Sequence, residues 1–243
     1  MNVLNGSTIA AYDPEYAFVF YVEGNATLTM YDSTLRCCGF DADHPGLYVQ
    51  GSAELKNCTI SENYCGLYCY GSSASVYGCQ IIDNVDLGIG CENSTIKVEN
   101  CTLTGNGNAI RCYYSNATII GCEIRNNDDN IVLELSNIFV ESCQVSEGWI
   151  GILSSASVVT VCGCTLTENS YGVTCFDSDL CVRECRIANN REVGILCFTS
   201  KFVLAGNEFV NDGLRISGPK LADFVGLIEN NTVNGKQLYY ILS

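Results

Sequence analysis

The sequence predicts an all-β fold, a single-stranded right-handed parallel β-helix that winds through about eleven coils of three short strands each. Three observations support this prediction: cysteine recurs every 21 or 22 residues, pairs of alternating apolar residues flank it, and asparagine recurs at a fixed distance after it. We expect one domain over residues 1–243, with regular coils at about 53–205 and looser, insertion-bearing coils at both ends.

The first predicted strand of each repeat begins at the recurring cysteine. An aliphatic residue follows two positions later, as in Cys58 and Ile60, and alternate residues of a strand point to the same face. The regular cysteines are Cys58, Cys79, Cys101, Cys122, Cys143, Cys164 and Cys185. Four polar residues extend the series into the looser coils: Ser7, Ser33, Asn207 and Asn231.

Two further apolar patterns complete each repeat. One pair precedes the cysteine, as Ala74 and Val76 precede Cys79, and predicts a second strand. A third run, usually opened by glycine, follows each cysteine, as residues 66–69 follow Cys58. Each repeat therefore holds three short strands, and the polar residues between them form turns.

Asparagine marks one of these turns, five residues after the cysteine. Its side-chain amide can bond the equivalent residue one coil above and below, and asparagine tolerates the left-handed backbone conformation. The series contains Asn63, Asn84, Asn106, Asn127, Asn169 and Asn190, and only Gly148 interrupts it. We therefore expect an asparagine ladder.

The seventeen cysteines could form disulfides, bind a metal or pack as free thiols. Cysteines stacked in register would be about 4.8 Å apart, which exceeds the usual Cβ separation in a disulfide. Zinc is disfavoured because His44 is the only histidine and no cysteine pair has a partner pair at zinc-finger spacing. We expect packed free thiols and no metal, with Cys162 and Cys181 facing outward, where they are available to react or pair.

Composition narrows the possible partners. The net charge of −15 and the pI near 4.2 would repel phosphate backbones, which argues against nucleic acid. No run of 18 apolar residues occurs, so membrane insertion is not expected. A polysaccharide or a surface protein remains as a partner, and open rod ends would permit end-to-end or homo-oligomeric association.

One outward row offers a candidate binding surface. The residue that follows each third strand should point outward once per coil, giving Tyr70, Glu92, Tyr113, Glu134, Ser155, Phe176 and Phe198. Aromatic faces interleaved with carboxylates suit a sugar polymer, because rings stack on sugar C–H faces and carboxylates accept hydroxyl hydrogens. The alternative is that aromatic residues are simply favoured on exposed strands.

Two insertions near the N-terminus form the second candidate region. Residues 11–16 and 39–45 leave from the same corner of neighbouring coils, so their polar side chains could converge. Carboxylates at Asp13, Glu15, Asp41 and Asp43 suit calcium, and His44 suits general acid–base chemistry. The alternative is a pair of solvated loops that shield the end of the rod.

The repeat resembles the pectate-lyase-like superfamily of β-helices, with repeats of the carbohydrate-binding and sugar-hydrolase type. Residues 99–106 (Glu-Asn-Cys-Thr-Leu-Thr-Gly-Asn) show the resemblance, which extends over about 3–242. The polygalacturonase motifs are represented only by Asp128 and Asp129, and no acidic cluster accompanies Arg111 or Arg215 as in pectate lyases. The resemblance therefore implies the fold and a link to polysaccharides, without catalytic residues.

Three functions fit these observations. The leading hypothesis is a noncatalytic secreted or cell-surface β-helix that binds polysaccharide or a protein partner along one outward face. The second is a polysaccharide lyase, glycoside hydrolase or epimerase acting on uronic-acid polymers. The third is a structural rod of a phage or surface filament. We expect an extracellular or cell-surface location, and the sequence leaves a cytoplasmic one open.

Overall fold

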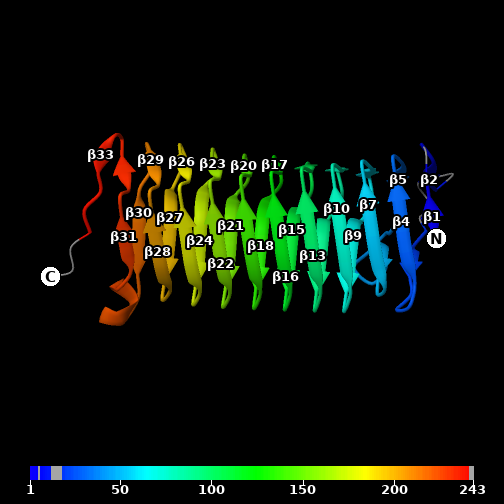
Figure 1. Cartoon of the computed structure of the whole chain (residues 1–243), viewed down its shortest axis with the longest axis horizontal. Coiled ribbons are helices and arrows are strands. Elements are labelled where there is room, and N and C mark those ends of the chain that lie inside the picture. Colours follow the sequence, from blue (N-terminus) through cyan, green and yellow to red (C-terminus); the bar gives the residue numbers. More distant parts are fainter. Residues whose placement is uncertain (5, 12–17, 241–243) are drawn as a thin grey trace.

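The computed structural model describes residues 1–4, 6–11 and 18–240 and shows a parallel β-helix, as predicted. The coils stack into a rod with the N-terminal and C-terminal parts at opposite ends (Figure 1). The described strands form three sheets of 11, 12 and 10 strands, close to the predicted coil number. Neighbouring strands in each sheet pair in parallel and come from successive coils; only β32 and β33 pair in antiparallel.

The first sheet contains β1 (Asn2–Val3), β4 (Thr27–Tyr31), β7 (Ser52–Lys56), β10 (Ser73–Tyr77), β13 (Thr95–Glu99), β16 (Asn116–Ile120), β19 (Asn137–Glu141), β22 (Val158–Cys162), β25 (Asp179–Arg183), β28 (Lys201–Ala205) and β31 (Leu227–Glu229). The second contains β2 (Thr8–Ala10), β5 (Thr34–Arg36), β8 (Thr59–Ser61), β11 (Gln80–Ile82), β14 (Thr102–Thr104), β17 (Glu123–Arg125), β20 (Gln144–Ser146), β23 (Thr165–Thr167), β26 (Arg186–Ala188), β29 (Glu208–Val210), β32 (Thr232–Val233) and β33 (Lys236–Gln237). The third contains β3 (Phe20–Val22), β6 (Gly46–Val49), β9 (Cys65–Tyr70), β12 (Leu87–Glu92), β15 (Asn108–Tyr113), β18 (Asp129–Glu134), β21 (Ile150–Ser155), β24 (Tyr171–Phe176), β27 (Val193–Phe198) and β30 (Leu214–Ser217).

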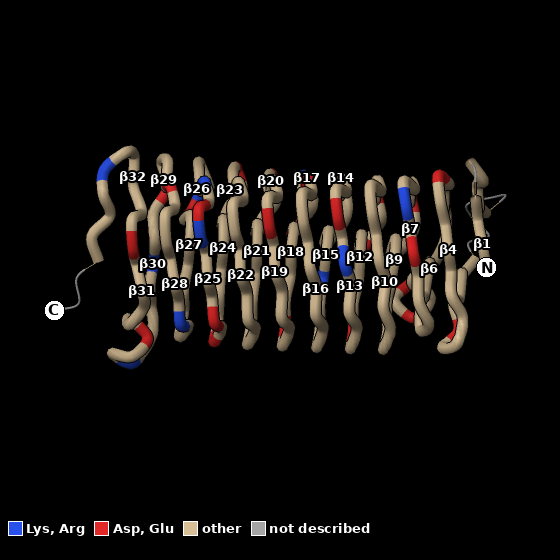
Figure 2. Tube along the Cα trace, viewed as in Figure 1, with Lys and Arg blue, Asp and Glu red and all other residues tan. Residues whose placement is uncertain are grey.

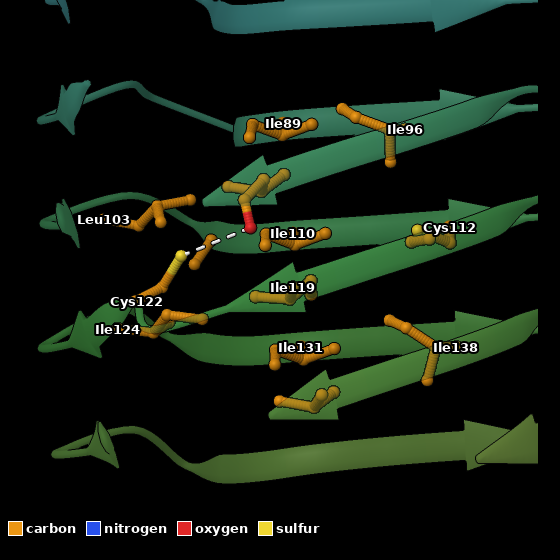
Figure 3. Close-up of a cluster of buried hydrophobic side chains, with 14 of the residues drawn as sticks. Ile89, Ile96, Leu103, Ile110, Cys112, Ile119, Cys122, Ile124, Ile131 and Ile138 are labelled. Atoms are coloured by element: carbon orange, nitrogen blue, oxygen red, sulfur yellow. Dashed lines mark hydrogen bonds between the residues drawn. The ribbon is translucent and has the colours of Figure 1, made fainter. Parts of the chain in front are cut away.

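The predicted inward residues form one continuous core. Equivalent side chains stack coil upon coil, as Ile89, Ile110 and Ile131 do on the third sheet (Figure 3). Ile119 and Cys122 close the same layer from the first sheet and the following corner. Apolar burial of this kind stabilises by about 25 cal/mol per Å². Because every inward position is matched in the next coil, the core runs along the rod.

A residue in the left-handed conformation begins each regular corner, and a ladder residue follows it. At the asparagine corner Glu62, Asp83 and Glu168 have positive φ, whereas Asn63 and Asn84 do not. The prediction that the asparagine itself adopts the left-handed conformation is thus wrong, because the preceding residue adopts it and makes the turn. This arrangement leaves the asparagine side chain free to point into the core.

The cysteine corner uses thiols as hydrogen-bonding groups. From Cys58 to Cys164, each ladder N–H donates to the Sγ atom of the next coil at 3.3–3.5 Å. Each Sγ donates in turn to a backbone carbonyl, and the dashed line in Figure 3 marks the bond from Cys122 to Val98 O. All seventeen cysteines are free and only Cys37, Cys162 and Cys181 are partly exposed. The packed free thiols are therefore confirmed.

The asparagine ladder is also present and is more continuous than predicted. Nδ2 to Oδ1 distances between successive asparagines are 2.8–3.1 Å. At Gly148 the fully buried side chain of Asn130 takes over: it accepts from Asn127 Nδ2 at 2.9 Å and donates to Asn169 Oδ1 at 3.0 Å. Asp212 ends the ladder by accepting from Asn190.

A serine ladder, which the sequence analysis did not predict, occupies the third corner. Each serine N–H donates to the Oγ atom of the serine in the next coil at 3.0–3.1 Å. Its members are Ser72, Ser94, Ser115, Ser136, Ser157, Ser178 and Ser200. At all three corners a backbone N–H therefore donates to the ladder side chain of the next coil, and the corners differ in the type of that side chain.

The last described coil departs from this regularity. Residues after β30 form the 3-10 helix η2 (Leu221–Phe224), and Tyr240 packs edge-on against Phe202 and donates a hydrogen bond to Phe224 O. No helix among the described residues is long and apolar enough to cross a membrane. Charged positions are scattered along the rod rather than gathered at one end (Figure 2).

Candidate functional site

The outward row predicted on the third sheet is aligned in the structure. Its members are the last residues of β9, β12, β15, β18, β21, β24 and β27, and they pair from coil to coil in unbroken register: Tyr70, Glu92, Tyr113, Glu134, Ser155, Phe176 and Phe198. Tyr70, Glu134, Phe176 and Phe198 are exposed, and the others are half-buried. The row lies beside a second outward row, two residues earlier in each strand.

Tyrosines dominate the N-terminal part of both rows. The rings of Tyr48 and Tyr68 are stacked with centroids 5.8 Å apart, and Tyr70 lies 6.4 Å from Tyr48 at 20°. Tyr21 closes the group edge-on at 5.5 Å from Tyr48. Aromatic pairs at these distances stabilise each other by about 0.5–1.5 kcal/mol beyond their burial. The result is an aromatic platform across three coils, on β3, β6 and β9.

A cleft of about 270 Å³ lies next to this platform. The side-chain row that contains Tyr68 continues to Gly90 and then Arg111, so one coil contributes no side chain. A Cβ atom at Gly90 would lie 2.6 Å from the Tyr68 ring, which leans over the glycine. The lining consists of Ala42, Pro45, Cys65, Tyr68, Asp86, Leu87, Gly90, Cys91, Glu92, Arg111 and Tyr113.

The cleft combines a hydrogen-bonded carboxylate with a guanidinium. Tyr68 donates its hydroxyl to Glu92 Oε2 at 3.0 Å, which holds that carboxylate at the cleft. Burial and then the negative charge of Glu92 raise the pKa of Tyr68, so this phenol remains protonated as a donor. Arg111 lies on the neighbouring strand, so the cleft can accept hydroxyl hydrogens at one point and bind an anion at another.

Cys65 forms part of the cleft wall, and its thiol is unreactive near neutral pH. Burial raises the pKa of its thiol to about 12, and the thiol is 3.9 Å from Asp86 Oδ2. A thiol of that pKa is not a nucleophile near neutral pH, because the thiolate is the reactive form. Cys65 therefore shapes the cleft, and Asp86 supplies a second carboxylate to it.

The insertion of residues 39–45 borders the cleft through its apolar residues. Ala42 and Pro45 line the cleft, whereas Asp41, Asp43 and His44 are absent from its lining. Asp41 instead pairs with His44 across 2.8 Å, and this hydrogen bond lowers the pKa of Asp41. The His44 ring also stacks on Phe40 at 4.4 Å. The side chains of Asp41 and His44 thus bond within the loop, and the loop forms one wall of the cleft.

The calcium interpretation involves residues beyond the described part of the chain. Asp13 and Glu15 lie outside the described residues, so their convergence on Asp41 and Asp43 stays a prediction. Within the described ranges no group of three or more histidine, cysteine or acidic side chains is placed to hold a metal ion.

The row residues beyond the cleft form a separate surface. Phe176 and Phe198 lie 6.1 Å apart, two and three coils beyond Glu134. The structure therefore places Glu92 and Tyr113 at the cleft, and leaves Glu134, Phe176 and Phe198 along the rod from it. Sequence reasoning missed the cleft itself, although one signal was present: Gly90 interrupts an outward series of large side chains.

Comparison with known proteins places the fold. Residues 65–213 match the family described as "Right handed beta helix region". The structure superposes on the periplasmic alginate epimerase AlgG with a TM-score of 0.75 at 14% identity, covering 92% of this chain and 64% of AlgG. This chain thus spans less than two thirds of AlgG.

A second similar structure is the A-module of the mannuronan C-5 epimerase AlgE6 from Azotobacter vinelandii. Its TM-score is 0.54 at 15% identity, with 98% of this chain and 77% of the A-module covered. A search of curated protein sequences found no match. At these identities the likeness concerns the fold alone.

Proposed function

From the premise that this chain belongs to the right-handed β-helix family, we propose that it binds a polysaccharide across its third sheet, with one sugar unit in the cleft between Tyr68 and Tyr113. The observation that supports this most is the cleft, where aromatic rings, a held carboxylate and a guanidinium meet. The fold it shares with polysaccharide-modifying enzymes is consistent with this class of ligand.

The chemistry of the cleft defines the sugar it suits. Tyrosine faces stack on the C–H face of a pyranose, and Glu92 and Asp86 accept hydrogens from sugar hydroxyls. Arg111 can pair with a sugar carboxylate in a bidentate manner, which favours a uronic acid over a neutral sugar. The stacked tyrosines and the cleft lie along the rod axis, so a polymer would run across successive coils.

Binding measurements on variants test the proposal. We expect Tyr113→Ala and Arg111→Gln each to lower the affinity for the bound polysaccharide about tenfold, which is about 1.4 kcal/mol. Affinity electrophoresis and calorimetry on a panel of neutral and uronic polysaccharides would measure this. Arg111→Gln should reduce selectivity for the uronic members, whereas Tyr113→Ala should weaken all ligands.

Tyr77→Ala is the matched control. Tyr77 is as exposed as Tyr70, at 42%, but it ends β10 on the first sheet. Its removal should leave affinity unchanged. Absence of binding to every polysaccharide in the panel, or an equal loss in the control, would rule the proposal out.

The enzymatic alternative has one specific observation in its favour. Tyr68 and Glu92 form a hydrogen-bonded pair that could transfer a proton to or from a bound uronic acid. Arg111 lies in the same cleft and could neutralise the carboxylate of that sugar. Incubation with uronic-acid polymers, with and without calcium, should then produce epimerised residues by NMR, unsaturated ends by ultraviolet absorbance or new reducing ends. The calcium arm also tests the calcium site predicted at Asp13, Glu15, Asp41 and Asp43. Turnover abolished by Glu92→Gln would establish this function over simple binding.

We also propose an extracellular or cell-surface location, where polysaccharides are met. The free thiols are compatible with an oxidising environment because most are buried and their hydrogen bonds hold them within the ladders. Fractionation of the native host with an antibody to the chain tests this, and recovery only from the cytoplasm contradicts it.

A further inference from the structure

A second cleft lies at the asparagine corner, where Gly148 replaces a ladder asparagine. It has a volume of about 730 Å³ and is open to solvent on the outside of the rod. Its lining includes Asp128, Glu147, Gly148, Trp149, Glu168 and Arg191. None of these residues lines the cleft on the third sheet. The site is therefore separate from the proposed polysaccharide site.

Trp149 is the central feature of this cleft. It is the only tryptophan in the chain, and 58% of it is exposed. Tryptophan is enriched at binding interfaces, because its large ring offers an apolar face and its indole N–H can donate a hydrogen bond. The ring of Tyr171, one coil further, supports Trp149 edge-on at 6.1 Å.

The backbone around Trp149 is fixed by its neighbours. Its N–H donates to Asp128 O at 2.7 Å, and its carbonyl accepts from Tyr171 N at 3.0 Å. The ladder behind it is closed by Asn130, so the missing side chain at Gly148 does not loosen the corner. The backbone that carries Trp149 is thus held in place before any ligand arrives, which reduces the entropy lost on binding.

The charges around Trp149 are mostly negative. Asp128, Glu147 and Glu168 line the cleft, and Glu147 and Glu168 hold the same left-handed corner position in successive coils. Arg191 is the one cation in the lining, and its guanidinium lies 3.9 Å from Glu192. No side chain in the described part of the chain forms an ion pair with those three carboxylates.

We infer that this cleft binds a ligand bearing an ammonium group, with the cation over the Trp149 face and Glu147 and Glu168 beside it. The indole face attracts cations through its quadrupole, and the uncompensated carboxylates add to that attraction. An anionic uronate would be repelled here, so the two clefts differ in the charge they select. The ammonium could belong to a free organic cation or to an amino sugar.

Tryptophan fluorescence provides a readout specific to this site, because Trp149 is the sole tryptophan. Choline and glucosamine oligomers serve as cationic probes, and N-acetylglucosamine oligomers of equal length serve as neutral matches. We expect a saturable fluorescence change with choline or the glucosamine oligomers and none with the N-acetylglucosamine oligomers. A response to choline indicates that the ammonium suffices; a response to glucosamine oligomers alone indicates that the sugar body is also needed.

Charge removal provides the second test. Glu147→Gln combined with Glu168→Gln should weaken binding of the cationic probe about tenfold, because the substitutions remove two carboxylates that attract the cation. Glu62→Gln is the control, because Glu62 has the same left-handed corner position outside the cleft. No saturable response to either cationic probe, an equal response to the neutral oligomers, or unchanged affinity in the double variant would overturn the inference. Loss of polysaccharide binding at the third sheet would not affect it.

Discussion

At each corner, the side chain of the ladder residue accepts a hydrogen bond from a backbone N–H of the neighbouring coil. A left-handed residue turns the chain, and the next N–H donates to a thiol, an amide oxygen or a hydroxyl of the equivalent residue one coil further. An unpaired buried N–H would cost free energy comparable to a lost hydrogen bond. The same side chain then donates to a backbone carbonyl, as Ser136 does to Glu134 O.

Ser154 lies on a strand rather than at a corner and is one of the buried polar side chains that lack a hydrogen-bond partner. Its side chain is fully buried in the inward row between Leu133 and Cys175, and its Oγ atom has no hydrogen-bond partner. Leaving a buried hydroxyl unpaired costs about 1–3 kcal/mol. We therefore expect Ser154→Ala to raise the free energy of unfolding by about 1 kcal/mol in urea denaturation.

Ser157→Ala is the comparison for that prediction. Ser157 accepts from Ser136 N and donates to Ser155 O, so its loss should lower the free energy of unfolding by about 1 kcal/mol. The two alanine substitutions should change the free energy of unfolding in opposite directions. If Ser154→Ala were destabilising to the same degree as Ser157→Ala, the hydroxyl of Ser154 would have a partner in solution.

At the scale of structural elements, the ladders join coils whose strands are short. Strands on the second sheet have only three residues in the regular coils, so the adjoining corner bonds contribute much of the coil-to-coil hydrogen bonding there. The ladder holds even where the repeat fails, because Asn130 of β18 reaches across to replace the amide missing at Gly148. A Cβ at residue 148 would lie 2.6 Å from Asn130 Nδ2, so the two positions depend on each other.

The bridging role of Asn130 predicts a large effect from one substitution. Asn130→Ala leaves the amides of Asn127 and Asn169 without their shared partner and should lower the free energy of unfolding by about 2 kcal/mol. Urea denaturation followed by circular dichroism measures this. Asn137→Ala removes an exposed amide bonded to Asn116 and should cost less than about 0.5 kcal/mol. Equal losses would show that the bridge contributes nothing.

The end of the asparagine ladder predicts a dependence on pH. Burial raises the pKa of Asp212, and its Oδ1 atom is buried without a partner. A carboxyl whose pKa is raised in the folded state stabilises most when protonated, and that contribution is lost as pH rises through the folded pKa. Asp212→Asn should therefore exceed the parent in stability at neutral pH, by less than about 1 kcal/mol because solvent screens the group.

Thermal unfolding between about pH 4 and pH 8 tests this, since the ordinary carboxyl pKa is about 3.9. The gap in melting temperature between Asp212→Asn and the parent should widen as pH rises. A gap that narrows toward neutral pH would mean that the ionised carboxylate is favourable at the end of the ladder.

On the scale of the whole molecule, three sheets enclose one continuous core. The reactivity of each thiol depends on whether it lies inside this core. Of the cysteines, only Cys37, Cys162 and Cys181 reach the surface, and Cys181 lies 3.1 Å from Arg183 Nε. Burial shields a thiol from reagents in solution.

Thiol labelling should therefore distinguish the native rod from the unfolded chain. We expect three thiols to react with a soluble disulfide reagent in native protein and seventeen in denaturant. Cys37 and Cys162 should react slowly, because burial raises the pKa of both thiols and the thiolate is the reactive form. Mass spectrometry of the labelled peptides identifies the sites. Rapid native labelling of ladder cysteines such as Cys122 would contradict an enclosed core.

The sequence determined the architecture of this protein, because one coil repeats many times and each inward residue is fixed by a period-two pattern within a repeat of 21 or 22 residues. That periodicity was sufficient to predict the strands, the thiol stack, the asparagine ladder and the alignment of Tyr70, Glu92 and Tyr113. Repetition reveals what is common to all coils. The serine ladder has the same signal, because its serines also recur every 21 or 22 residues, but the sequence analysis did not use it.

Only the tertiary structure decided where the coils differ. The bridge by Asn130, the turn that pairs Asp41 with His44, and the clefts beside Gly90 and Trp149 each depend on which side chains meet across coils. These contacts join residues far apart in sequence, and their geometry follows from rotamers and from space left by a missing side chain. A linear pattern records the position of such a gap, but only packing in three dimensions determines what fills it.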